Sequence, residues 1–269
     1  MVLVHVLWSL GLLSMLAISL LSSGTATYRL ARNGLDRVQA EAVTDAAVNR
    51  AVLALLDTRA DYRWRVDGVA QQFRFEGFDI TVSVQDEFGR IDLNHADAST
   101  IHRLLMSAGL DAGSASKLAD KILDWREAGD NRRLNGAKAR DYSLAGLGYA
   151  PRNGPFQIVD ELRLVMDMTE DLFKRIRPAL TVYSASQFID PQFAPPQALA
   201  AIPSMTAQTI AATIAARTKS GVGVIQPIVP LRGRAFSVRI QIQDSTSREV
   251  VVRLTDDPKQ PYWTLHRQR

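Results

Sequence analysis

The 269-residue sequence contains no cysteine. That absence excludes disulfide bonds, thiolate metal sites and a cysteine nucleophile. The sequence also lacks the nucleophile elbow G-x-S-x-G, the phosphate-binding motif G-x-x-x-x-G-K-[ST] and the dinucleotide-binding motif G-x-G-x-x-G. Its 32 basic residues are interleaved with 28 acidic ones, which does not by itself make a basic face. We therefore predict a protein that is not an enzyme.

The first 28 residues contain no Asp, Glu, Lys or Arg, and the first formal charge is Arg29. Residues 2–21 are nearly all apolar, and about 20 helical residues span roughly 30 Å, the hydrocarbon thickness of a bilayer. A secretory signal peptide would begin with basic residues and have a shorter apolar stretch. A buried core helix rarely begins at residue 2. We expect a transmembrane helix over residues 1–24.

The helical pattern continues beyond this span, because no proline or glycine interrupts residues 35–57. Apolar side chains recur there at spacings of three, four and seven residues: Leu35, Val38, Ala42, Ala46, Leu53 and Leu56. This periodicity predicts an amphipathic continuation of the span that packs one face on a sheet. A long helix that is apolar in its first half and amphipathic in its second is typical of a pilin-like subunit.

After this helix the apolar period changes from 3.6 to 2. Phe78, Ile80, Val82 and Val84 alternate with polar residues, which predicts a strand that forms a hairpin through Glu76-Gly77. A short strand around Ile91 and Leu93 closes this block. Residues 236–242 and 250–254 alternate in the same way, and Trp263 and Leu265 predict a short final strand.

Between the two strand blocks the pattern is helical. We predict an α+β fold in which a long N-terminal helix packs on an antiparallel sheet and a large all-helical domain is inserted. The expected domains are a transmembrane helix (1–24), a pilin-like helix with the first strands (25–94), the inserted helical domain (95–221) and the C-terminal strands that complete the sheet (222–269).

Short turns separate the expected helices, and an N-capping Asp or Thr follows Leu110, Met168 and Met205. Helical hairpins of this kind suggest an alternative function, a membrane-anchored helix-hairpin-helix module that binds DNA phosphate through backbone N–H groups. None of the three turns has two glycines that frame a hydrophobic residue, and one contains Asp167. We therefore favour an architectural role and expect no nucleic-acid partner.

Acidic residues gather on and beyond the expected helix that carries Trp125. Carboxylates from a helix end and a polar loop are the ligands that Ca²⁺ prefers. The candidate ligands of a calcium ion are Asp124, Glu127, Asp130 and Asp141. The alternative is a solvated helix face on which these acids pair with Arg126, Arg132 and Arg133.

Several short motifs occur in the order known from one protein family. They are V-L-V-H-V-L-W (2–8), D-E-F-G-R-I-D-L-N (86–94), L-D-W-R (123–126), R-L-N-G-A (133–137), P-F-Q (155–157), D-E-L (160–162), L-T-V-Y-S (180–184) and R-A-F (234–236). The sequence resembles the K-class minor pseudopilins of bacterial type II secretion systems, also called general secretion pathway protein K. The similarity covers nearly the whole chain.

The resemblance implies a structural tip component of the pseudopilus, anchored in the bacterial inner membrane by a single span with the bulk of the chain in the periplasm. The implied partners are the I and J minor pseudopilins, the major pseudopilin and the prepilin peptidase that removes a basic leader. Met1 falls at the first mature position. The positive-inside rule applied to Arg29, Arg32 and Arg37 would place the bulk in the cytoplasm, and a basic leader would resolve that conflict.

Two details of the resemblance concern particular positions. Most pseudopilins carry Glu at mature position five; this chain has His5 there, and lacking the Glu is characteristic of the K class. The calcium region of the family is richer in acid than Glu127-Ala128-Gly129 and Lys138, so we predict that folding does not depend on calcium. The residues expected to serve the membrane anchor and helix packing are Val4, His5, Trp8, Leu12, Leu35 and Val38.

Overall fold

The computed structural model describes residues 2–59, 62–219, 231–243 and 247–268. The chain divides into two compact units, Met1–Ala47 and Val48–Arg269. The first unit is helical and belongs to α1 (Val2–Leu56), which confirms the predicted long N-terminal helix. The side chains of residues 17–27, 30 and 33 lie outside the described residues.

The last two turns of α1 belong to the second unit and bury one face. Val48, Ala51, Val52 and Leu55 are buried, whereas Leu53 is 68% exposed. Leu56 is also exposed, so the predicted packing stripe that included these two leucines was wrong. Three of the four buried side chains on this face are Val or Ala, which are smaller than Leu. The hydroxyl of Tyr262 donates to Asn49 Oδ1 at 2.9 Å and ties this end of α1 to the last strand.

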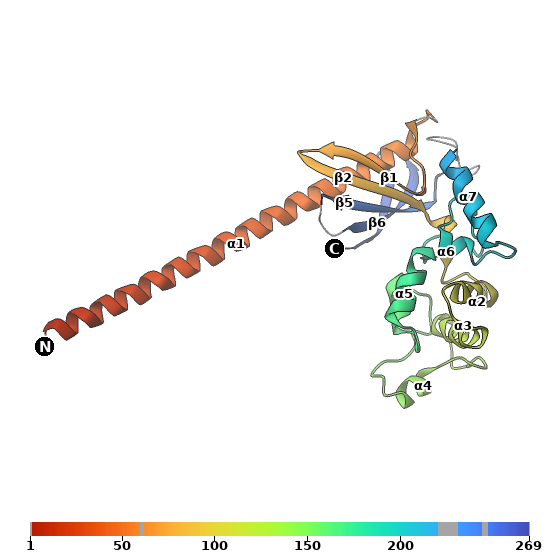
Figure 1. The fold of residues 1–269 in the computed structure, drawn as a ribbon, viewed down its shortest axis with the longest axis horizontal. Helices are drawn as coiled ribbons and strands as arrows, with labels where there is room; N and C mark the ends of the chain where they lie inside the picture. Colours follow the sequence, from red (N-terminus) through yellow and green to blue (C-terminus); the bar gives the residue numbers. More distant parts are fainter. Residues whose placement is uncertain (1, 60–61, 220–230, 244–246, 269) are drawn as a thin grey trace. The chain divides into compact units, whose positions relative to one another are not determined.

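The second unit contains a five-stranded antiparallel sheet (Figure 1). Its strands, in spatial order, are β1 (Asp67–Phe75), β2 (Phe78–Asp86), β5 (Ala235–Ile242), β6 (Arg248–Asp257) and β7 (Gln260–Arg267). Glu76 and Gly77 both have positive φ, as a tight hairpin turn between β1 and β2 requires, and this confirms the predicted hairpin. Ile80, Val82 and Val84 are buried on one face of β2, as the alternation predicted.

The pairing of β2 with β5 joins the two strand blocks of the sequence in one sheet. β2 pairs with β5 so that Asp86 lies opposite Phe236, and the intervening residues leave and re-enter the sheet on neighbouring strands. In Figure 1 the orange strands β1 and β2 lie beside the blue strands β5 and β6, with α2 to α6 gathered beyond one end of them. This arrangement confirms the predicted α+β class with an inserted helical part.

The short strand β3 (Ile91–Asp92) does not extend the main sheet. It pairs in parallel with β4 (Leu180–Thr181) inside the helical part. A 3₁₀ turn, η2 (Glu87–Gly89), redirects the chain directly after β2. Gly89 is needed there, because a Cβ at this position would lie 2.5 Å from the backbone carbonyl carbon of Phe193.

The helices of the inserted part are short. They are α2 (Ala98–Ser107), α3 (Ala112–Arg126), α4 (Ala139–Leu144), α5 (Glu170–Ile176), α6 (Pro196–Leu199) and α7 (Ala207–Lys219), with 3₁₀ turns η3 (Val159–Leu164) and η4 (Arg177–Ala179). The predicted caps are confirmed: the side chains of Asp111, Thr169 and Thr206 accept the backbone N–H three residues ahead. The predicted domain boundary at 221/222 lies outside the described residues.

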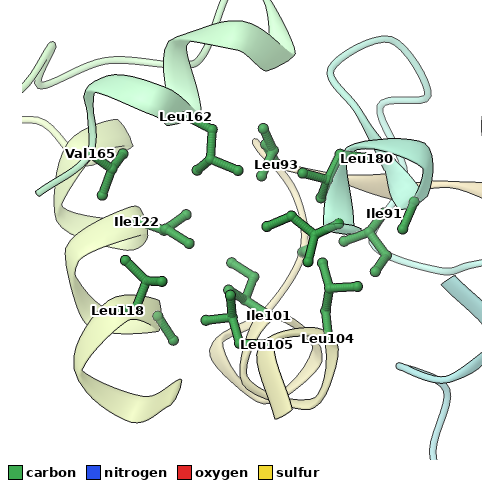
Figure 2. Close-up of a cluster of buried hydrophobic side chains, with 14 of the residues drawn as sticks. Ile91, Leu93, Ile101, Leu104, Leu105, Leu118, Ile122, Leu162, Val165 and Leu180 are labelled. Atoms are coloured by element: carbon green, nitrogen blue, oxygen red, sulfur yellow. The ribbon is translucent and has the colours of Figure 1, made fainter. Parts of the chain in front are cut away.

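A single apolar core joins β3 and β4 to these helices. Ile101, Leu104 and Leu105 of α2 meet Leu118 and Ile122 of α3, as Figure 2 shows. Leu162 and Val165 close the core from the side of η3. Burying a Leu or Ile side chain contributes about 1.5–3 kcal/mol, so this core accounts for much of the stability of the helical part.

Candidate functional site

The candidate calcium ligands lie around the end of α3 and the loop that follows it. Asp124 is fully buried in the last turn of α3, and its carboxylate accepts the backbone N–H of Arg133 at 3.2 and 3.3 Å. Burial raises the pKa of Asp124 above its ordinary value, although the N–H of Arg133 and the charge of Lys138 oppose that shift. Gly136 leaves room for this carboxylate, since a Cβ there would lie 1.8 Å from Asp124 Oδ2.

The other three carboxylates have separate surroundings. Glu127 Oε1 accepts a hydrogen bond from Arg133 Nη2 at 2.5 Å, and Asp141 Oδ1 accepts one from Arg132 Nη1 at 3.1 Å. Asp130 is exposed. Within the described residues, no three His, Cys, Asp or Glu side chains are grouped so that they could hold a metal ion. Three of the four predicted ligands are engaged by arginines or backbone N–H groups, and the calcium site stays a prediction.

Lys138 occupies the place where the backbone oxygens of this loop meet. Its Nζ donates to the carbonyl oxygens of Asp124 at 2.7 Å and Glu127 at 2.9 Å, and to Asn153 Oδ1 at 3.0 Å. The side chain is buried although it carries a charge. From the sequence, Lys138 was interpreted only as a position where the family it resembles is richer in acidic residues. The backbone carbonyls that accept its hydrogen bonds leave no signal in the sequence.

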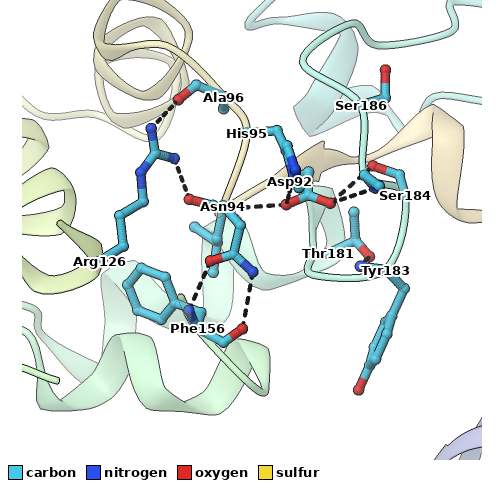
Figure 3. A network of polar contacts seen from close by, with 12 residues as sticks. Asp92, Asn94, His95, Ala96, Arg126, Phe156, Thr181, Tyr183, Ser184 and Ser186 are labelled. Atoms are coloured by element: carbon cyan, nitrogen blue, oxygen red, sulfur yellow. Dashed lines mark hydrogen bonds and ion pairs between the residues drawn. The ribbon is translucent and has the colours of Figure 1, made fainter. Parts of the chain in front are cut away.

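A second polar network holds β3 in the helical part (Figure 3). Asp92 is buried and accepts hydrogen bonds from Ala185 N at 2.9 Å and Ser184 Oγ at 3.2 Å. The amide of Asn94 pairs with the backbone of Phe156, accepting its N–H at 2.7 Å and donating to its carbonyl at 2.9 Å. These contacts connect three of the sequence motifs, at residues 86–94, 155–157 and 180–184.

A third network lies where the helical part meets the sheet. Arg234 Nη2 lies 2.7 Å from Asp86 Oδ2, and both side chains are buried. The guanidinium of Arg234 also lies 4.5 Å from the ring centre of Phe88. Burial raises the pKa of Asp86 to about 6, against the opposing effect of Arg234. Beside this pair, Arg90 Nη1 donates to Glu87 Oε1 at 3.0 Å and to Ser237 Oγ at 2.9 Å.

The residues expected to serve the anchor and helix packing are all exposed: Val4, His5, Trp8, Leu12, Leu35 and Val38. Trp8 exposes 72% of its surface although it is large and apolar. Met1 and the side chains of residues 17–27 of the predicted span lie outside the described residues. Among the residues that are described, no helix combines the length and apolarity required to cross a bilayer.

The three helical hairpins have turns with a left-handed residue, namely Gly109, Asp167 and Ser204. Asp167 forms an ion pair with Lys121 of α3. This places a carboxylate in the turn, where a DNA phosphate would be repelled. The ion pair links the turn before α5 to α3.

A long N-terminal helix, an antiparallel sheet and a helical part inserted between β2 and β5 define a pilin-like subunit with an enlarged head. Residues 81–185 match the family described as type II secretion system (T2SS), protein K. This stretch runs from β2 through β3, α2 to α5 and β4, and it contains the Lys138 and Asp92 networks. Over residues 81–185, which make up less than half of its length, the chain is therefore similar to the protein K family of type II secretion systems.

Curated relatives agree with this assignment. The chain is 26% identical to type II secretion system protein K of Klebsiella pneumoniae over 197 residues, which are 65% of this chain and 60% of that protein. It is 26% identical over 90 residues to a putative type II secretion system protein K of Escherichia coli K12, covering 34% of this chain and 28% of that protein. The alignments thus span less than two thirds of either relative.

The fold is similar to that of a solved structure. A chain of the crystal structure of the GspK-GspI-GspJ complex from enterotoxigenic Escherichia coli superposes with a TM-score of 0.63 at 14% identity. The match covers 88% of this chain and 98% of that chain. The DNA-binding alternative receives no support from these findings.

Proposed function

We propose that this chain is a structural subunit that caps the pseudopilus of a type II secretion system. In this proposal α1 anchors the protein in the inner membrane, the second unit lies in the periplasm, and the subunit joins minor pseudopilins of the I and J classes. The solved complex supports the choice of partners, because the chain it contains has the same fold over 88% of this sequence. The subunit catalyses no reaction.

The proposal rests on two features that occur in one chain: an exposed apolar surface on α1 and a large helical insert in the second unit. The first part of α1 exposes apolar side chains around the helix, among them Leu3, Trp8 and Leu12. Such a surface is stable only in lipid or against other apolar helices. The chain also inserts a helical part between β2 and β5, and we expect its bulk to hinder a further subunit from stacking on this one. We therefore expect the first part of α1 to serve assembly and the helical insert to hinder the addition of a further subunit.

The test is co-expression of the full chain with the I-class and J-class pseudopilins of the same system, followed by purification in detergent. We expect one complex that contains all three proteins, and gold labelling of assembled filaments should mark only their ends. Failure to co-purify, or gold particles spread evenly along filaments, would remove the capping proposal.

A shortened variant tests the role of the helical part. Asp86 and Phe236 are register partners on neighbouring antiparallel strands, so an Asn-Gly turn can join residue 86 to residue 236 in place of the insert. Asp86→Ser removes the carboxylate that would lose Arg234. If this variant folds, we expect it to lose end-specific labelling. A folded variant that still labels only filament ends would show that capping does not depend on the insert.

The anchor is tested by Leu12→Asp, with Leu12→Ile as the matched control. An unpaired charge inside a bilayer or an apolar helix bundle costs several kcal/mol, so the Asp variant should neither assemble nor support secretion. The Ile variant should do both. Normal secretion by the Asp variant would mean that this segment is not a packed anchor.

A further inference from the structure

The ammonium group of Lys138 is completely coordinated. An ammonium has three N–H donors, and this one has three oxygen acceptors within 3.0 Å: the Asp124 carbonyl, the Glu127 carbonyl and Asn153 Oδ1. The residue is 5% exposed, so water cannot replace these contacts readily. A lysine is rarely buried to this degree unless its charge is compensated.

The surroundings are arranged for a positive charge. The two carbonyls belong to the C-terminal end of α3, where backbone C=O groups have no partner within the helix and the helix dipole favours a cation. Asn153 has a positive φ of 52°, a conformation that Asn tolerates better than most residues. The buried carboxylate of Asp124 adds a negative charge close to the ammonium, whose Coulombic effect opposes the rise in the pKa of Asp124.

We propose that Lys138 is a built-in cation, which holds by its own charge the oxygen atoms that a divalent ion would otherwise gather. The two carbonyls and the amide oxygen are hard oxygen ligands of the kind that Ca²⁺ takes, six to eight at a time with water. Replacing Lys138 by Glu removes the internal cation and adds a carboxylate next to Asp124 and Glu127. The loop then becomes a calcium site, and its order becomes dependent on calcium.

The consequence of this proposal is that the structure of the loop does not depend on the calcium concentration of the medium. The loop that Lys138 closes follows α3 and packs beside Trp125 and Phe156, whose rings stack at 6.2 Å between their centres. With Lys138 in place, the helical part keeps its structure at any calcium concentration. Assembly is then insensitive to calcium as well.

The experiment is thermal unfolding of the full chain in detergent, in chelator and in millimolar Ca²⁺. The melting temperature of the unaltered protein should be the same in both. Lys138→Glu should melt about 10 °C lower in chelator, since it leaves buried polar groups without their partner, and Ca²⁺ should restore most of that loss. Lys117→Glu makes the same charge change at an exposed position of α3 and should respond to neither.

Two further measurements keep the test decisive. Lys138→Met removes the charge without adding a carboxylate, and it should also melt lower, with a weaker response to Ca²⁺. If Lys138→Glu does not fold in chelator, refolding followed by circular dichroism should succeed only with Ca²⁺ present. The proposal is overturned if Lys138→Met melts like the unaltered protein, if Lys138→Glu shows no calcium response in either measurement, or if Ca²⁺ raises the melting temperature of the unaltered protein.

Discussion

The five-stranded sheet and the inserted helical part provide hydrogen-bond partners for their buried backbone groups in different ways. In the sheet, neighbouring strands bond to each other in a regular antiparallel ladder, while Ile80, Val82 and Val84 turn to one buried face. Among α2 to α7 the longest helix is α3 with 15 residues, and several connections are irregular. There, the buried side chains of Asp92 and Lys138 and the half-buried side chain of Asn94 bond directly to backbone groups outside the helices.

The difference follows from the length of the elements. Helices of fewer than about 12–15 residues are marginal by themselves, and buried backbone groups without partners are costly. The helical part therefore depends on particular polar side chains, whereas the sheet depends on its apolar alternation. Substitutions that remove polar contacts should therefore lower stability more in the helical part than in the sheet. The largest loss of stability is expected where the two regions meet.

The largest effect is expected for Arg234→Met at that junction. The variant leaves Asp86 buried without its partner, which should lower the free energy of unfolding by about 3–5 kcal/mol at pH 7.5. The folded-state pKa of Asp86 is about 6, above its ordinary 3.8, so protonation stabilises the folded state, fully below about pH 4 and no longer as the pH rises through 6. The cost should therefore be smaller at pH 5 than at pH 7.5.

Chemical denaturation at the two pH values measures this difference. Arg232→Met is the control, because Arg232 is exposed and pairs with Asp256 on the surface. An Arg234→Met cost that did not change between pH 5 and 7.5 would show that the charge of Asp86 does not cause it.

Asn94→Ala should have the next largest effect. It removes two hydrogen bonds and leaves the N–H and carbonyl of the buried residue Phe156 without partners, at a cost of about 2–3 kcal/mol. Asn131→Ala, in an exposed loop of the same region, should change stability by no more than about 0.5 kcal/mol. Equal denaturation midpoints for the two variants would contradict the role given to Asn94.

Gly136→Ala tests the packing around the buried carboxylate of Asp124. The added methyl group would lie 1.8 Å from Asp124 Oδ2 and 3.1 Å from Arg133 N, so the loop must shift. Overpacking of this kind costs about 1–3 kcal/mol. Gly148→Ala is the matched control, since no atom lies within 4 Å of the position its Cβ would take. The two melting temperatures should differ by several degrees, and identical values would show that the loop yields freely.

The smallest effect is expected in the sheet. Tyr262→Phe removes one hydrogen bond between β7 and α1, from Tyr262 to Asn49, and should cost about 0.5–1 kcal/mol in thermal unfolding. A cost as large as that of Asn94→Ala would erase the distinction between the two regions, because the sheet would then depend on single polar contacts too.

Local sequence patterns were sufficient to predict many of the helices and strands and much of their order along the chain. The alternation around Ile80 and Val238 identified strands that the structure pairs across the insert, and Asp111, Thr169 and Thr206 marked helix starts where they occur. These features are readable because hydrophobic period and capping act over a few neighbouring residues. The family resemblance rested on the same short motifs.

Two features of the fold were decided by tertiary structure. Both sides of α1 near its end carry apolar residues, so the pattern alone selected Leu53, whereas the structure buries Val52 and Leu55. β3 found its partner in β4, far along the chain, and not in the neighbouring hairpin.

The candidate site shows the same limit most clearly. The sequence by itself determined that acidic residues and one lysine lie near the end of α3, and that this region carries fewer acidic residues than the family it resembles. Only the tertiary structure decided that Lys138 reaches the carbonyls of Asp124 and Glu127. The physical reason is that the acceptors are backbone oxygens, which every residue carries. Their convergence depends on how α3, its following loop and Asn153 fold together, and no pattern of side chains records it.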